Sequence, residues 1–154
     1  MSFPVASFES FSIKRTFNHN VENVFKAWTD SEAKSKWFVG LGNWKLVNRS
    51  LDFRVGGEEV LQGNYDGRME TLFTAHYHEI IANFRIVYDY VMTLNQAIHS
   101  VSLSTVEFFE KEEGSEMIYN EQITFLDGTK GEKGRLSRIH GTEAHFDRFE
   151  KFLD

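Results

Sequence analysis

Cysteine is absent from this sequence of 154 residues, and proline occurs once, at Pro4. The absence of cysteine excludes disulfides and thiol chemistry, and it favours a reducing compartment. With a single proline near one end, nothing marks an interdomain linker. A chain of this length is enough for one domain with its own core. We therefore expect residues 1–154 to form a single domain.

Long apolar runs and basic clusters are missing too. No run of about 18 apolar residues is present to form a transmembrane helix, and the first ten residues lack the basic and apolar regions of a secretion signal. The net charge is −6, from 17 basic and 23 acidic residues. A protein that binds nucleic acid needs a basic face. The group closest to one consists of Lys130, Lys133, Arg135 and Arg138, but acidic residues lie among them. We expect a cytoplasmic protein that neither inserts into a membrane nor binds nucleic acid.

Aromatic residues, by contrast, are abundant. They make up 15% of the chain and include 15 phenylalanines, and 41% of all residues are hydrophobic. Such a composition is far from that of a disordered chain. Phenylalanine at this density indicates a broad core, or a core that surrounds an aromatic-lined hollow.

The first third of the chain predicts a strand followed by two short helices. Residues 8–17 alternate between apolar and polar side chains, as in a half-buried strand. A helix then begins at an Asn cap, residue 18 or 20, and Thr29 and Asp30 end it. Ser31 is expected to cap a second helix. Each helix carries a tryptophan near its end, so the stretch "VFKAWTDSEAKSKWF" (24–38) predicts a V-shaped bracket with an aromatic inner face.

The rest of the chain predicts an antiparallel meander and a long helix. Apolar residues recur with a period of two between Gly, Asn and Asp turns, in strands near 44–54, 58–65, 69–79, 84–93, 100–110 and 116–126. The segment 134–154 has a helical apolar stripe, formed by Ile139, Phe146, Phe149 and Leu153. We predict an α+β fold in which a curved antiparallel sheet of six to seven strands grips the C-terminal helix. A hollow would then lie between sheet and helix.

Five motifs in this order resemble the START-related helix-grip (SRPBCC, Bet v 1-like) superfamily. More narrowly, the chain resembles its domain family named after the activator of the Hsp90 ATPase, which is similar to polyketide cyclases. The matching stretches are "VFKAWTDSEAKSKWF", "FRVGGEE", "RIVYDYVM", "STVEFFEKEEGSEMIYNEQITFLDG" and "RIHGTEAHFDRFEKFL". In the last one, Ile139 stands where the family commonly has Glu before His. The resemblance implies a helix-grip fold, but the superfamily holds ligand carriers, cyclases, stress proteins and co-chaperone domains, so fold alone does not assign function.

Motifs for metal, nucleophilic or phosphate chemistry are incomplete. His76 and His78 share one strand face, but no Cys or carboxylate cluster completes a metal site. No Gly-x-Ser-x-Gly elbow is present. The segment "GTKGEKG" (128–134) lacks P-loop spacing, and we interpret it as a loop over a pocket mouth. We expect no metal and no resident cofactor.

Glu121 is the least typical residue of the sequence, because it shares a predicted strand face with Met117, Tyr119, Ile123 and Phe125. If this face points inward, the carboxylate is desolvated, which makes it a candidate acid, base or ligand anchor. Two alternatives remain open: a one-residue bulge moves Glu121 outward, or a partner such as Arg15 or His140 neutralises it.

The predicted site is an apolar cavity that a few polar groups reach. Its expected walls are Trp28, Trp37, Phe73, Tyr88, Tyr90, Ile123, Phe146 and Phe149. The polar groups are Tyr77, Tyr119, Glu121 and His140. Such a hollow suits a flat, mostly apolar molecule held by one or two hydrogen bonds. The alternative is that these aromatic residues simply fill the core.

Three functions follow. The first is binding of a small hydrophobic or aromatic ligand. The second is a cyclase or hydro-lyase, in which Glu121 or His140 moves protons and a tyrosine hydroxyl holds an enolate. The third, implied by the resemblance, is an Hsp90-type chaperone-associated stress-response protein. A chaperone partner and a homodimer are both compatible with the sequence.

Overall fold

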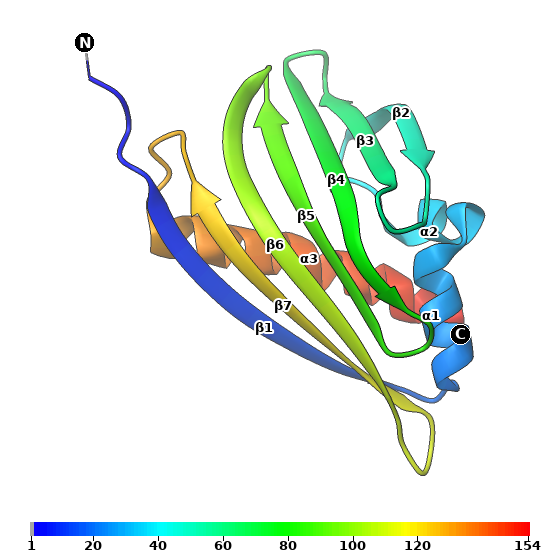
Figure 1. Ribbon diagram of the computed structural model, residues 1–154. Coiled ribbons are helices and arrows are strands. Elements are labelled where there is room, and N and C mark those ends of the chain that lie inside the picture. Colours follow the sequence, from blue (N-terminus) through cyan, green and yellow to red (C-terminus); the bar gives the residue numbers. More distant parts are fainter. Residues whose placement is uncertain (1) are drawn as a thin grey trace.

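A seven-stranded antiparallel sheet curves around one long helix in the computed structural model, which describes residues 2–154 (Figure 1). The strand order across the sheet is β1-β7-β6-β5-β4-β3-β2, so β1 and β2 form its open edges. The elements along the chain are β1 (Ser7–Phe17), α1 (Val21–Thr29), α2 (Ser31–Trp37), β2 (Trp44–Leu51), β3 (Glu58–Tyr65), β4 (Met69–Ile81), β5 (Arg85–Leu94), β6 (Ala97–Glu110), β7 (Ser115–Phe125) and α3 (Gly131–Leu153). The predicted α+β helix-grip fold is confirmed.

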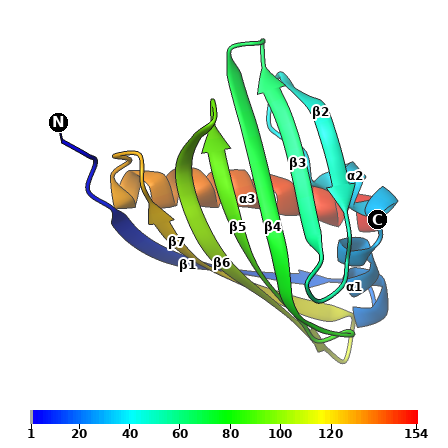
Figure 2. The ribbon, with the colours of Figure 1, turned by 45° about the horizontal axis from the view of Figure 1, so that its top comes forward.

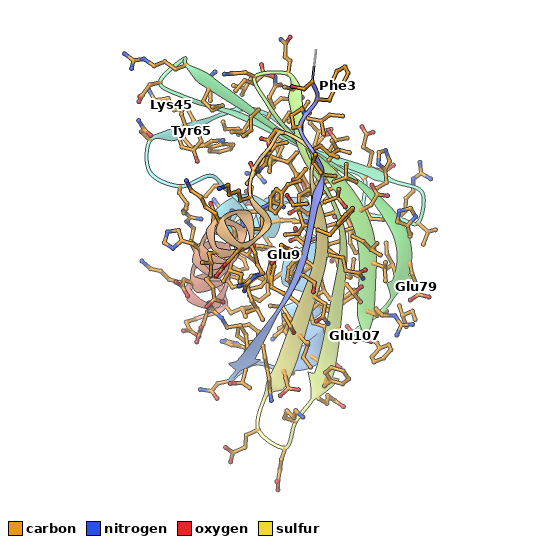
Figure 3. The ribbon with its side chains drawn as sticks, turned by 90° about the vertical axis from the view of Figure 1, so that its left-hand side faces the viewer. Phe3, Glu9, Lys45, Tyr65, Glu79 and Glu107 are labelled. Carbon is orange, nitrogen blue, oxygen red and sulfur yellow. The ribbon has the colours of Figure 1, made fainter. Side chains whose placement is uncertain are left out.

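The three helices cover one face of the sheet. Figure 2 shows α3 running across the strands, with α1 and α2 near its C-terminal end. Figure 3 views the layers from the side, with the sheet on one side and α3 on the other. Among residues 2–154, no helix has the length and apolar character needed to cross a membrane.

The sheet keeps Glu121 on its inner face. Residues of β7 from Ser115 to Phe125 pair without a register shift with both β1 and β6. Because side chains alternate along a regular strand, Glu121 stays on the same side as Tyr119 and Ile123, and its exposure is 1%. The alternative of a bulge that turns Glu121 outward is therefore wrong.

One residue, Asp30, joins the two short helices. Its backbone N–H donates to Lys26 O and ends α1, while its side chain accepts from Ala33 N at 3.1 Å and begins α2. The cap of α2 is thus Asp30 and not Ser31, which is the first helical residue. Asp can accept the free N–H of the third helical residue directly, so the chain turns between the helices without an extra linker.

This turn brings the two tryptophans together. The rings of Trp28 and Trp37 lie 4.9 Å apart with an edge-to-face geometry, and Phe149 of α3 contacts both. Trp37 Nε1 donates to Ala27 O at 2.9 Å, so its polar group is satisfied although the side chain is buried. The predicted bracket is present, and it carries the C-terminal half of α3.

The first prediction concerns this turn. Replacing Asp30 by Ala removes the cap of α2 and is expected to lower the free energy of unfolding by about 1 kcal/mol, measured by urea denaturation. Asp30→Asn keeps a side-chain acceptor and should stay close to the wild type. Equal destabilisation by both variants would contradict the capping role.

Candidate functional site

A cavity of about 870 Å³ lies between α3, the helical bracket and the concave face of the sheet. Most of its wall is aromatic or aliphatic, formed by Trp28, Trp37, Phe38, Leu41, Trp44, Leu61, Phe73, Tyr88, Tyr90, Met92, Leu94, Tyr119 and Phe146. The aromatic residues therefore surround an open space and do not simply fill the core.

Trp44 shapes one end of this space. Its indole lies directly over two glycines: a Cβ atom at Gly63 would come within 1.9 Å of the ring, and one at Gly40 within 2.2 Å. Trp44 Nε1 donates to Thr71 Oγ1 at 2.9 Å. Only glycine at both positions lets the ring lie flat against the backbone, so these residues fix where the cavity wall stands.

A buried ion pair lies behind the wall at the bracket. Lys34 of α2 donates to Glu59 Oε1 at 2.7 Å, and the Tyr77 hydroxyl donates to the same oxygen at 2.6 Å. Lys34 and Glu59 are only 3% and 2% exposed. Lys34 reaches the cavity lining, whereas Glu59 and Tyr77 do not.

Aromatic rings surround the Lys34 ammonium. It lies 5.3 Å from the centre of Trp28 and 5.1 Å from that of Phe38, distances at which ring faces attract a cation. Burial lowers the pKa of Lys34, nearby Glu59 raises it, and the charge of Arg49 lowers it again, with a net decrease. For Tyr77, burial and Glu59 both raise the hydroxyl pKa, so it stays a neutral donor.

A second buried network surrounds Glu121. Oε2 accepts from Tyr90 and Ser102, each at 2.7 Å, and Oε1 accepts from Tyr119 at 2.6 Å. Arg138 of α3 donates to Oε2 at 2.9 Å. Arg15 and His140 were considered as partners, but Arg15 contacts three acidic residues of α3, namely Glu143, Asp147 and Glu150. The neutralising residue is Arg138.

Charges in this network are fixed by their neighbours. Burial raises the pKa of Tyr90 and Tyr119 well above its usual value. The charge of Arg138 lowers the pKa of Tyr90 and Glu121 raises that of both, and the net increase keeps both hydroxyls protonated. Burial lowers the pKa of Arg138, but the net shift is upward and the carboxylate of Glu121 is among the groups that raise it, so the guanidinium remains charged. Arg138 lines the cavity, while Glu121 lies behind it.

His145 adds a neutral polar group to the lining. Burial lowers its pKa to about 4, and the nearby charge of Arg148 acts in the same direction. Nε2 lies 2.9 Å from the carbonyl oxygen of Val39, so the neutral ring donates from that nitrogen.

The predicted site residues fall into three groups. Those that line the cavity are Trp28, Trp37, Phe73, Tyr88, Tyr90, Tyr119 and Phe146. Buried residues outside the lining are Tyr77, Glu121, Ile123 and Phe149. His140 is exposed, which corrects its placement in the cavity. It follows Arg138 by two residues, roughly 200° around the helix, and therefore faces away.

Sequence reasoning missed Lys34, Trp44, Glu59, Arg138 and His145. The signal for Arg138 was its spacing, since it lies eight residues before Phe146 on the same helical stripe. The signal for Glu59 was strand parity, because it shares a face with Leu61. Neither signal was used for these two residues, because charged side chains are usually expected to point to solvent.

The structure shows no cluster suited to a metal ion among residues 2–154. His76 and His78, considered above as metal ligands, are exposed on β4. They pair with carboxylates on neighbouring strands: His76 contacts Glu58 at 3.2 Å, and His78 contacts Asp89.

Comparison with known proteins identifies the family. The profile of the activator of Hsp90 ATPase homolog 1-like proteins matches residues 18–154. The chain belongs to this family. No curated protein sequence matches it.

Solved structures of similar chains share the fold. A putative uncharacterized protein from Rhizobium leguminosarum is 37% identical, with a TM-score of 0.89 over 97% of this chain and 96% of that one. A protein from Rhizobium loti is 32% identical, with a TM-score of 0.86 over 96% and 99% of the two chains. An activator-like protein from Aeromonas hydrophila is 17% identical, with a TM-score of 0.66 over 94% and 92%, and shows the shared fold.

The second prediction concerns the pair Lys34–Glu59. Either Lys34→Met or Glu59→Gln leaves one buried charge without its partner and should cost about 3–5 kcal/mol of unfolding free energy. The double variant removes both charges, so its cost should be smaller than that of either single variant. Urea denaturation of the four proteins gives the coupling energy. Additive costs would show that the two charges act independently.

The third prediction concerns His145. Its pKa of about 4 in the folded chain lies below the value near 6.5 of an unfolded histidine, so the unfolded chain takes up the proton first as pH falls. Stability should drop between about pH 6.5 and 4, by about 2 kcal/mol at pH 5. The free energy of unfolding can be measured by urea titration above pH 6.5 and at pH 5. His145→Gln, which retains a donor for Val39, should show a smaller drop between the two conditions than the wild type. An equal drop in both proteins would contradict this assignment.

Proposed function

We propose that this protein binds a small, mostly apolar molecule in the cavity under α3. The observation that carries the proposal is the open, aromatic-lined space itself, whose volume of about 870 Å³ lies in the range of ligand pockets, roughly 300–1,000 Å³. Aromatic walls favour a flat ligand, since ring faces and edges offer large contact areas. The few polar groups in the wall would orient it.

Gly141 in the cavity wall borders on open space. It lies on α3 in the cavity lining, and a Cβ atom added there would meet nothing within 4 Å. Glycine costs a helix interior roughly 1 kcal/mol relative to alanine. A side chain at this position would therefore favour the helix while occupying the space that a ligand needs.

The acid–base alternative has weaker support. Glu121 is enclosed by three hydroxyl groups and Arg138 and lies outside the lining, and His140 is exposed. A general base must come within hydrogen-bond reach of the substrate proton. The chaperone-associated function, the chaperone partner and the homodimer stay predictions.

The fourth prediction tests ligand binding with the neutral fluorescent probe N-phenyl-1-naphthylamine. The wild-type protein should bind it saturably, with enhanced probe emission and quenching of tryptophan fluorescence. Gly141→Leu should weaken binding by about tenfold, equivalent to 1.4 kcal/mol, because the leucine occupies cavity volume.

Gly141→Ala is the matched control. It adds one methyl group and should bind the probe within about twofold of the wild type, whereas both variants gain helix propensity. Thermal unfolding shows that each variant is folded. Lack of saturable binding by the wild type, or equal binding by Gly141→Leu, would reject the cavity as a binding site.

A further inference from the structure

The charge distribution around the cavity is one-sided. Among the described residues that line it, the charged ones are Lys34, Lys130, Lys133 and Arg138, and none is Asp or Glu. The whole chain has the opposite balance, with 23 acidic and 17 basic residues. Both carboxylates that balance the buried cations, Glu59 and Glu121, lie outside the lining. A ligand in the cavity therefore faces the positive ends of both ion pairs.

Not all N–H groups of Arg138 donate to described residues. Its hydrogen bonds to Tyr90, Ser102 and Glu121 come from Nη1, and its bond to Ser100 at 2.7 Å comes from Nη2. Nε donates to no described residue, and it is not among the fully buried polar atoms that lack a partner, so part of its surface is exposed. A guanidinium has five N–H groups arranged as a planar fork, and the free ones are available to a ligand.

Arg138 is not the only group that stabilises the Glu121 carboxylate. Three hydroxyl groups, from Tyr90, Ser102 and Tyr119, already donate to its two oxygens. Charge-assisted hydrogen bonds of this kind stabilise a buried carboxylate. The guanidinium is thus held in place by Glu121 and the serines but is not saturated by them.

Lys34 is less exposed than Arg138. It donates to Glu59 at 2.7 Å and has the rings of Trp28, Trp37 and Phe38 around its ammonium. Its side chain is 4% exposed, against 13% for Arg138. Lys130 and Lys133 lie at the start of α3, are exposed, and add positive charge near the solvent.

We infer that the natural ligand of the cavity is an organic anion, an apolar and mostly flat body with one carboxylate or similar acidic group, and that Arg138 binds this group. The inference rests on the proposed binding function. An arginine guanidinium can form paired hydrogen bonds with a planar oxyanion, and the aromatic wall would accept the apolar body. Lys130 and Lys133 favour entry of a negative ligand, an effect that salt weakens.

The fifth prediction uses three compounds of nearly equal shape. At neutral pH, 2-naphthoic acid is an anion, 2-naphthamide is neutral and 2-naphthylmethylamine is a cation. The acid should displace N-phenyl-1-naphthylamine at a concentration about tenfold lower than the amide, because hydrogen bonds to a charged group contribute more than neutral ones. The amine should be the weakest of the three.

Two double variants locate the effect. Arg138→Met/Glu121→Gln removes a cation and its counter-ion together, and should abolish the preference for the acid while keeping binding of the amide. Arg135→Met/Glu9→Gln removes a similar pair from the same helix, joined at 3.0 Å outside the cavity, and should keep the preference. In the wild-type protein, the Nε–H resonance of Arg138 should shift more with the acid than with the amide, a measurement independent of how the variants fold.

The outcomes separate the two proposals. Equal displacement by acid and amide, or no displacement by the acid of a probe that does bind, would overturn the anion inference and leave the cavity as a binding site. An unshifted Arg138 resonance with bound acid would also overturn it. Failure of the probe and all three compounds to bind would overturn the proposed function itself.

Discussion

The ion pair between Arg138 and Glu121 is the contact on which the open cavity depends. It ties the middle of α3 to β7 at a distance set by a long side chain on the helix and a short one on the sheet. Farther along, Phe146 and Phe149 pack α3 directly against the tryptophans of the bracket. The N-terminal half of the helix has polar contacts to the sheet as well, including Arg135 with Glu9.

A buried ion pair is a costly way to hold a helix. Desolvating both charges offsets most of their attraction, and a well-packed apolar pair is often as stable. Apolar side chains at residues 121 and 138 would also draw together and fill space, because protein cores close around voids. The charged pair keeps an oriented cation in a mostly apolar cavity wall.

Glycines and aromatic rings set the shape of the cavity together. Gly40 and Gly63 let the Trp44 indole lie against the backbone, and Gly141 leaves space beside α3. The same rings contribute to stability: Trp28 and Trp37 are 3% and 1% exposed and contact each other as well as α3. Lys34 lies among them, so the bracket that completes the core also brings a second cation to the cavity.

By itself, the sequence determined the elements and their order. Alternation with a period of two predicted the strands, helical spacing predicted α1 and α3, and five motifs pointed to the helix-grip fold, because these patterns depend on neighbours in the chain. The aromatic wall was predicted for the same reason. Only the tertiary structure decided which charged residues pair with each other. Arg138 and Glu121 are 17 residues apart, Lys34 and Glu59 are 25 apart, and such pairs form only when separate elements pack together, so no local pattern encodes them.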